Sequence, residues 1–181
     1  MLQAEIGSAK ITAAESIPTR RHLMPDFTLS SSDGKQVSLY DYRGRANVLL
    51  LFAGRVQDSA EHPLLSALLM RYREITDTDS EAVVVVAESV GRAEEFHRKM
   101  HFPFPVLSDP DMRVHKLVGA VGAQAVPASA LYITDRFLEV FAAWRTGIGD
   151  RLPDISDVLS WLTYLDSQCP ECTQIEWPTD D

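Results

Sequence analysis

Cysteine is scarce in this sequence. Only two of its 181 residues are cysteines, Cys169 and Cys172, and both lie near the C-terminus. Two thiols so close together cannot form the network of disulfides that stabilises small secreted domains. We therefore expect a reducing compartment and predict a cytoplasmic location.

Long hydrophobic runs are absent as well. The longest, residues 48–54 and 82–87, are far shorter than the ~20 residues that a helix needs to cross a bilayer. Residues 1–10 offer no continuous apolar segment of the kind found in secretion signals. We expect neither membrane association nor export, and we interpret both runs as buried strands.

Positive charge is in the minority. Lysine and arginine number 17 against 26 aspartates and glutamates, which gives a formal net charge of −9. A negative field of this kind repels phosphate backbones and anionic lipids, so we expect no nucleic acid or membrane partner. With 45% hydrophobic and 24% charged residues, the composition is that of a globular chain, and its length suits one domain.

An alternation of strands and helices is what the sequence does contain. Apolar residues alternate on either side of a glycine turn near the start, which predicts a hairpin at a sheet edge around residues 30–35. Continuous apolar runs and helical periodicities follow it. Further strands are expected at residues 48–52, 83–86, 104–107, 130–134 and 138–144, and helices at residues 63–75, 91–100, 114–118 and 155–165. This order predicts an α/β fold, a mixed sheet between layers of helices.

Three regions are expected along the chain. Residues 1–24 lack a clear period for most of their length and are interpreted as a leader arm. Residues 25–166 form the domain, and residues 167–181 form a tail that carries both cysteines.

Two stretches of sequence resemble a known family. Residues 25–29 (Pro-Asp-Phe-Thr-Leu) and 33–44, followed by the strand to Phe52, resemble the opening of the redoxins, the group of the peroxiredoxins and the thioredoxin-like thiol reductases. Residues 126–133 resemble the family's cis-proline, here Pro127, and the strand behind it. The resemblance implies a thioredoxin-like fold, with an N-terminal β-hairpin and a C-terminal tail around the central mixed sheet.

The loop after the first central strand departs from the family. In redoxins this loop holds the reactive cysteine at a helix N-terminus, where the helix dipole stabilises a thiolate. A thiol reductase of this type would have its cysteines at about Gln57 and Ala60, and a peroxiredoxin would have its own near Glu61. Ser129 stands where peroxiredoxin-like sites carry an arginine. Both the usual nucleophile and its usual cation are therefore expected to be missing.

The same loop is still a candidate for substrate binding. Gln57, Asp58 and Ser59 are polar and lie at the carboxyl end of a central strand, where folds of this class bind ligands, and Pro127 is expected beside them. Asp58 or Ser59 can equally cap the helix that follows. Both interpretations stay open.

The motif Cys169-Pro170-Glu171-Cys172 carries the sharpest chemical signal. Two thiols with this spacing can take part in redox exchange, close a structural or regulatory disulfide, or provide half of a metal site. His97 and His101, or a second subunit, would have to complete such a metal site. The preceding helix end and nearby acidic residues would raise the thiol pKa, so we expect slow nucleophiles.

Two functions follow from these residues. The first is a thiol-disulfide oxidoreductase or antioxidant protein that acts through Cys169 and Cys172 as its catalytic pair, with a thioredoxin-type reductant and no metal or other cofactor. The resemblance adds homodimerisation as a family-level expectation. The alternative is a catalytically silent module that uses the redoxin scaffold to bind a protein or a ligand.

Overall fold

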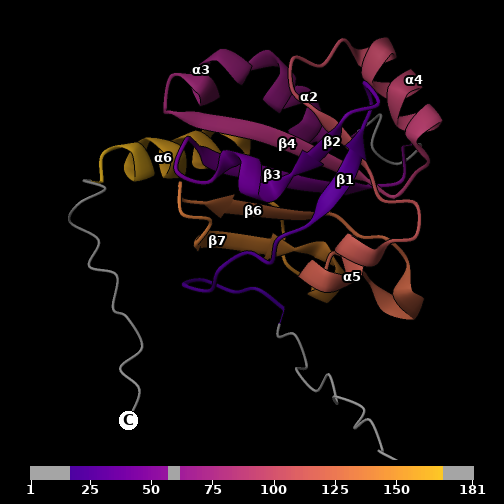
Figure 1. Cartoon of the computed structure of the whole chain (residues 1–181). Coiled ribbons are helices and arrows are strands. Elements are labelled where there is room, and N and C mark those ends of the chain that lie inside the picture. The colour runs from indigo at the N-terminus through magenta and orange to yellow at the C-terminus, as the bar shows by residue number, and fades with distance from the viewer. Residues whose placement is uncertain (1–16, 57–61, 169–181) are drawn as a thin grey trace, which may run out of the picture.

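A seven-stranded mixed sheet forms the centre of the molecule in the computed structural model, which describes residues 17–56 and 62–168. The strands lie in the order β2-β1-β5-β4-β3-β6-β7 (Figure 1). Their bounds are β1 Thr28–Ser31, β2 Gln36–Ser38, β3 Asn47–Gly54, β4 Ser80–Val86, β5 Val106–Ser108, β6 Ala130–Thr134 and β7 Val140–Arg145. β3, β4 and β5 run parallel, while β1, β6 and β7 join the sheet through antiparallel pairs. The predicted hairpin, β1 and β2, lies at one edge.

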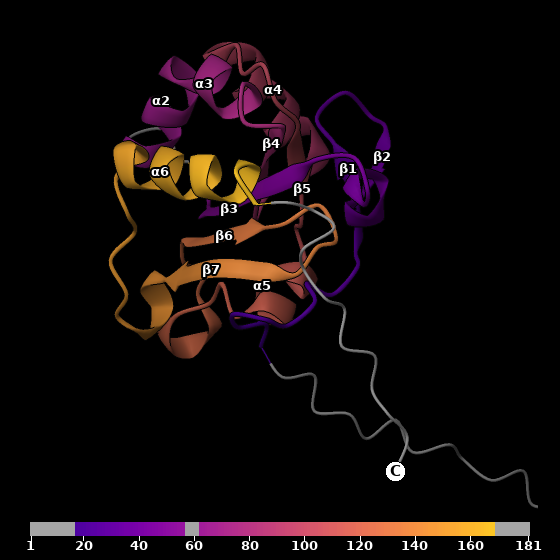
Figure 2. The ribbon, with the colours of Figure 1, turned by 90° about the vertical axis from the view of Figure 1, so that its left-hand side faces the viewer.

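Helices cover both faces of this sheet. They are α2 Pro63–Met70, α3 Tyr72–Thr76, α4 Val90–Met100, α5 Arg113–Val118 and α6 Ile155–Asp166, with short 3-10 turns η1 Leu39–Tyr42, η2 Ala123–Ala125 and η3 Thr146–Ile148. Figure 2 shows α2, α3, α4 and α6 on one side of the strands and α5 on the other. The predicted α/β fold of the thioredoxin-like type is confirmed.

The continuous apolar run of β3 is explained by this double cover. All eight of its residues are buried. Leu49 and Leu51 face the core beneath α2 and α6, whereas Leu50 and Phe52 face the core beneath α5. A strand that is buried on both faces needs apolar side chains at every position, and alternation with polar residues is lost.

The helix predicted for residues 63–75 is interrupted. Arg71 has φ −107° and ψ 15°, which ends α2 and starts α3. The break leaves Leu68 at the end of α2 and Ile75 in α3 both fully buried. The prediction of one helix was wrong because the apolar spacing continues through the break and conceals it.

The N-terminal part of the described chain lies along β7. The N–H of Arg21 donates to the carbonyl of Val140 at 2.8 Å, and the N–H of Met24 donates to Leu138 at 2.8 Å. Met24 is also buried in the core beneath α5. Residues 1–16 and 169–181 lie outside the described residues, so the proposed domain boundaries stay predictions.

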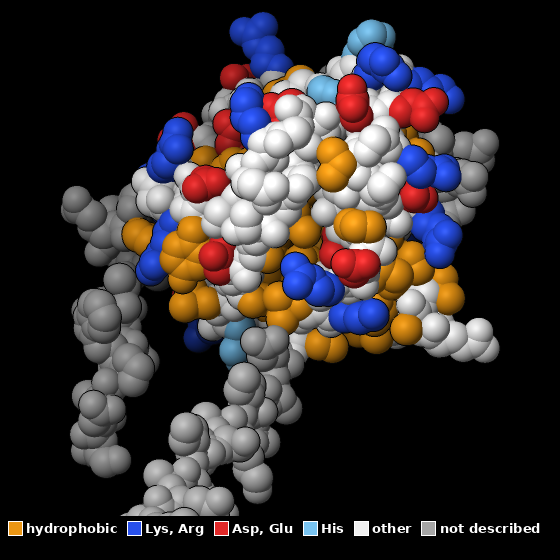
Figure 3. All heavy atoms as spheres, turned by 45° about the vertical axis from the view of Figure 1, so that its right-hand side comes forward, with side chains coloured by type: hydrophobic (Ala, Val, Ile, Leu, Met, Phe, Trp, Pro, Cys, Tyr) orange, Lys and Arg blue, Asp and Glu red, His pale blue; other side chains and the backbone are white. Residues whose placement is uncertain are grey.

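The surface carries both signs of charge. On the face shown in Figure 3, acidic and basic side chains are interspersed over the upper part, and apolar side chains gather lower down. Among the described residues, no helix combines the length and the apolar character that crossing a bilayer requires.

Candidate functional site

The carboxyl end of β3 forms the floor of the candidate site. The strand ends at Gly54, whose φ of +73° is a conformation that side chains rarely adopt. Its carbonyl accepts a hydrogen bond from the N–H of Ala87 at 2.8 Å, which ties the end of β3 to the end of β4. Residues 57–61 lie outside the described residues. The predicted binding residues Gln57, Asp58 and Ser59 therefore stay untested.

Helix α2 begins just beyond this loop. His62 occupies the N-cap position and makes no side-chain capping bond, and Pro63 is the first helical residue. The alternative expectation that Asp58 or Ser59 caps this helix was wrong. Proline is favoured at the first helical position, because its ring fixes a helical φ and it has no N–H to satisfy, so the cap falls on the residue before it.

His62 is the titratable residue at this helix start. Its Nδ1 is buried and has no hydrogen-bond partner in the described residues. Burial lowers the pKa of His62, because a protonated imidazole would lose hydration there. A neutral imidazole thus lies at the N-terminus of α2, beside the first N–H groups of the helix and the positive end of its dipole. This arrangement suits a weak base or a hydrogen-bond partner for a polar ligand.

A broad groove of about 1130 Å³ runs from His62 to the start of α6, and we name it the Trp144 groove. Its walls combine apolar rings with acidic residues and one arginine. The lining residues are His62, Pro63, Leu64, Ala67, Trp144, Thr146, Asp150, Arg151, Leu152, Pro153, Asp154, Ile155, Asp157 and Trp161. The groove therefore joins the start of α2, the end of β7 and the first turn of α6.

Pro127 lies beside Gly54, as a Cβ built on Gly54 would be 3.9 Å from the carbonyl oxygen of Pro127. Its peptide bond is not cis, since the described residues contain no cis bond. The predicted cis-proline was wrong. Val126 has φ −74° and ψ 139°, the extended conformation that suits a residue before a trans proline. The N–H of Ala128 bonds to the carbonyl of Ala120 at 3.0 Å, which holds the segment in place.

Arg145, which no sequence pattern indicated, lies next to Ser129, the position at which the resemblance to the family would put an arginine. The register of β6 and β7 pairs Arg145 with Ala130, the residue after Ser129. The main-chain N–H and the hydroxyl of Thr146 both donate to the Ser129 carbonyl, each at 2.9 Å. Only the hairpin register could have indicated this neighbourhood, because 16 residues separate Ser129 and Arg145 in the sequence.

The guanidinium of Arg145 acts on the α5 face of the sheet. Burial raises the pKa of Tyr132 to about 12, and Arg145 acts in the opposite direction. The hydroxyl of Tyr132 donates to the carbonyl of Val118, and Nε of Arg145 is buried without a partner. A cation is thus present near Ser129, but it is directed toward Tyr132 on the α5 side.

Cys169 and Cys172 lie outside the described residues, so the structure does not test their role. Within residues 17–56 and 62–168, no group of three His, Cys, Asp or Glu side chains could hold a metal ion. His97 lies on α4 and His101 follows it as the C-cap. Whether this pair meets the cysteines stays a prediction.

Comparison with solved structures gives the same fold. Peroxidoxin BcpB from Mycobacterium tuberculosis superposes with a TM-score of 0.71 at 17% identity, over 81% of this chain and 97% of that one. AhpC from the same organism gives a TM-score of 0.68 at 19% identity, over 86% and 98% of the two chains. At these identities the likeness establishes the thioredoxin-like fold alone.

Relatives in sequence are also similar. A Mycobacterium tuberculosis protein assigned to the peroxiredoxins is 33% identical over 102 residues, which are 54% of this chain and 62% of that protein. Chloroplastic peroxiredoxin Q of Oryza sativa is 27% identical over 116 residues, 62% of this chain and 52% of that protein. The matched segment thus spans less than two thirds of either relative.

The family model matches most of the domain. The description of that model is AhpC/TSA family, and the match covers residues 21–142, from the segment beside β7 to the middle of β7 itself. This is more than half of the chain. Together with the fold and the resemblance at residues 25–44 and 126–133, it shows that the chain belongs to the AhpC/TSA family.

Proposed function

We propose that this protein is a peroxiredoxin-like redoxin whose thiol chemistry resides in Cys169 and Cys172. One observation carries the proposal. The chain of 181 residues has two cysteines, and neither lies in the loop where redoxins place their nucleophile. Any thiol step carried out by this chain must use one of these two residues. Peroxiredoxins among the relatives suggest hydroperoxides as the substrate class.

The chemistry needs both thiols. The thiolate of one cysteine attacks an oxygen of a hydroperoxide, and the O–O bond breaks. The cysteine becomes a sulfenic acid, while the other oxygen takes up a proton and leaves as an alcohol. The second thiol then displaces water from the sulfenic acid and a disulfide forms. A dithiol protein of the thioredoxin type reduces this disulfide by exchange and is itself oxidised.

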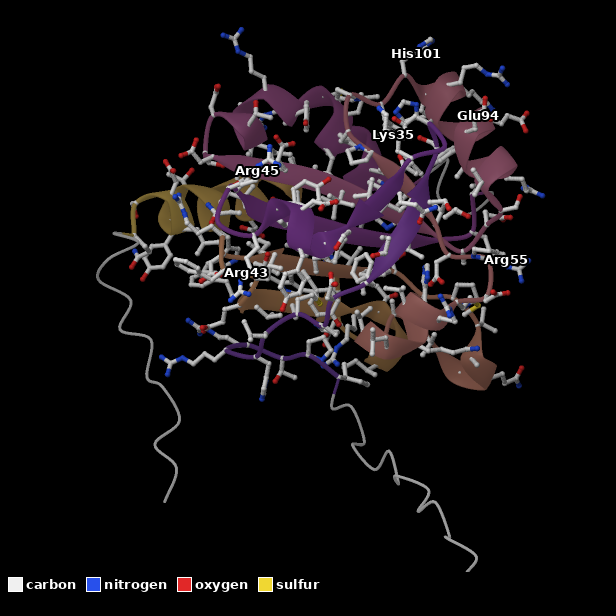
Figure 4. The ribbon with its side chains drawn as sticks, in the orientation of Figure 1. Lys35, Arg43, Arg45, Arg55, Glu94 and His101 are labelled. Carbon is white, nitrogen blue, oxygen red and sulfur yellow. The ribbon has the colours of Figure 1, made fainter. Side chains whose placement is uncertain are left out.

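The position of the end of α6 favours a thiol site away from the loop that holds the nucleophile in redoxins. Gln168, the last described residue before the pair, borders the same pocket as Asn47, which begins β3. The loop where redoxins place their nucleophile follows Gly54, at the other end of that eight-residue strand. The two ends of the strand are roughly 25 Å apart. Figure 4 shows Arg55 on the side of the molecule opposite the end of α6.

The available length of chain is short compared with this distance. Cys172 is the fourth residue after Gln168, and four extended residues span at most ~14 Å. We therefore expect the pair to act near the end of α6 rather than to replace the family's nucleophile in the loop. The proposal therefore assigns the dithiol a site of its own.

A peroxidase assay on the full chain tests the proposal. The assay follows the consumption of an organic hydroperoxide with thioredoxin, thioredoxin reductase and NADPH. We expect turnover that Cys169→Ser and Cys172→Ser each abolish, while Thr173→Ala, a matched change beside the pair, leaves it intact. A thiol count should fall from two to zero after stoichiometric peroxide.

Two results would overturn the proposal. Turnover that persists in the double serine variant would show that the thiols are not responsible. Thiols that remain reduced in excess hydroperoxide, in a protein without bound zinc, would leave the silent scaffold as the function.

A further inference from the structure

A small cavity lies far from the loop of the family site. It has a volume of about 280 Å³ and is enclosed by the start of β3, the β6–β7 turn, the segment beside β7 and the last turn of α6. We name it the Arg136 pocket. Its size is close to the lower limit of ~300 Å³ for small-molecule sites.

Three arginines border this pocket, Arg20, Arg21 and Arg136. Among the described residues, none of them forms an ion pair with a carboxylate. Arg20 lies over the ring of Phe141, 5.4 Å from its centroid, which fixes one cation at the wall. The main chain at the other two arginines is fixed by hydrogen bonds, since the N–H of Arg21 donates to the carbonyl of Val140 at 2.8 Å and the carbonyl of Arg136 accepts from the N–H of Gly44 at 2.7 Å.

Asn47 supplies an independent indication of a ligand. This residue borders the pocket and is only 3% exposed. The amide Nδ2 is buried and has no hydrogen-bond partner in the described residues. A desolvated donor without an acceptor is costly in a folded protein, and an acceptor oxygen in the pocket would remove that cost.

Two carboxylates also border the pocket and limit the charge of what can bind. Oδ1 of Asp135 accepts from the N–H groups of Phe137 at 2.8 Å and Glu139 at 2.9 Å, so it is engaged in its own turn. Glu139 is the second carboxylate. Three cations against two anions leave one positive charge uncompensated, which favours a ligand with a single negative charge.

We propose that the Arg136 pocket binds a small monocarboxylate with an apolar body. The guanidinium groups and the Asn47 amide are the donors for the carboxylate. Val140, Phe141 and Leu165 provide the apolar wall. This site needs neither cysteine, so it is independent of the proposed thiol chemistry.

A carboxylate can come from two sources. It can belong to a free organic acid, or to the acidic residues of the chain after Gln168, which are Glu171, Glu176, Asp180 and Asp181. Both sources have the same chemistry at the pocket. A full-length variant with all four acids changed to their amides distinguishes them.

Titration of the full chain with benzoate, followed by calorimetry, tests the proposal. We expect a dissociation constant in the range of ~0.1–1 mM, and no binding of benzamide, which has the same shape without the charge. Asn47→Asp and Arg136→Gln should each weaken binding about tenfold or more. Arg98→Gln, on the exposed side of α4, is the matched control and should bind as the unaltered protein does.

The outcomes separate clearly. If the amide variant binds benzoate more tightly, the chain's own acids compete for the pocket, and if it binds equally, a free acid is the occupant; both results support a carboxylate site. Asn47→Asp could fail to fold, which its circular dichroism would reveal, and Arg136→Gln then carries the test. Absence of benzoate binding, equal binding of benzamide, or unchanged binding in Arg136→Gln would overturn the proposal.

Discussion

Nδ1 of His115 lies 2.7 Å from Oδ2 of Asp109, and both side chains are buried beneath the sheet. The same carboxylate accepts main-chain N–H bonds from Arg113 at 3.0 Å and His115 at 2.8 Å, at the start of α5. Phe52 of β3 meets the imidazole edge to face, with 5.1 Å between ring centroids. One aspartate therefore holds both the first turn of α5 and the histidine that packs it against β3.

Removing this carboxylate should destabilise the fold. Asp109→Asn keeps the size of the side chain but weakens its three hydrogen bonds and leaves the buried imidazole poorly paired. We expect a loss of about 3 kcal/mol in the free energy of unfolding, measured from urea denaturation midpoints. Asp111→Asn, at an exposed position two residues away, should change it by less than ~0.5 kcal/mol. Equal midpoints for the two variants would contradict this interpretation.

Two aspartates, Asp109 buried and Asp135 half-buried, should give opposite pH dependences. Burial raises the pKa of Asp109, but the hydrogen bonds from His115 together lower it by more. The net shift of the pKa is therefore downward. For Asp135, burial raises the pKa and the bonds from Glu139 and Phe137 do not fully offset it. The unfolded reference for both is ~3.9.

The stabilisation from Asp109 is therefore complete above the unfolded pKa and is lost as the pH falls through the native one. Asp135 behaves conversely, because its ionised form is disfavoured in the native state at neutral pH. The stability gap between the unaltered protein and Asp109→Asn should close below about pH 4. Asp135→Asn should be as stable as the unaltered protein or more so at pH 7, with the difference shrinking on acidification. Denaturant midpoints across this range test both, and parallel profiles would refute the assignment.

Gly147 should not tolerate a side chain. A Cβ there would lie 2.1 Å from the carbonyl oxygen of Val121 and 3.0 Å from the N of Gly122, both main-chain atoms. We expect Gly147→Ala to cost about 3 kcal/mol. Gly91, in the first turn of α4, has open space around it, and Gly91→Ala should stabilise by about 0.5 kcal/mol through helix propensity. Thermal unfolding of the two variants is the measurement, and a tolerated Gly147→Ala would show that η3 can move away from Val121.

Local sequence patterns predicted the elements that depend on them. The apolar run of β3 and the hairpin of β1 and β2 follow from residues close together in the chain. Gly119, with φ +74°, ends α5 in the left-handed conformation that favours glycine.

Features that depend on distant pairing were not accessible. Arg145 comes next to Ser129 only through the register of two strands. The Arg136 pocket joins residues as far apart as Arg20, Asn47 and Gln168. The conformation at Pro127 depends on the bonds that its two neighbours make, from Ala128 to the carbonyl of Ala120 and from Gly122 to the carbonyl of Val126, rather than on the proline itself.

Helix α6 borders both the Trp144 groove and the Arg136 pocket. Its start lines the Trp144 groove with Ile155, and its end lines the Arg136 pocket with Leu165. A buried stripe that includes Val158 and Leu162 packs α6 against the core, so the helix connects the groove and the pocket as one rigid element. Any shift or tilt of α6 would change the shapes of the groove and the pocket together, so a ligand bound at one end would alter ligand binding at the other.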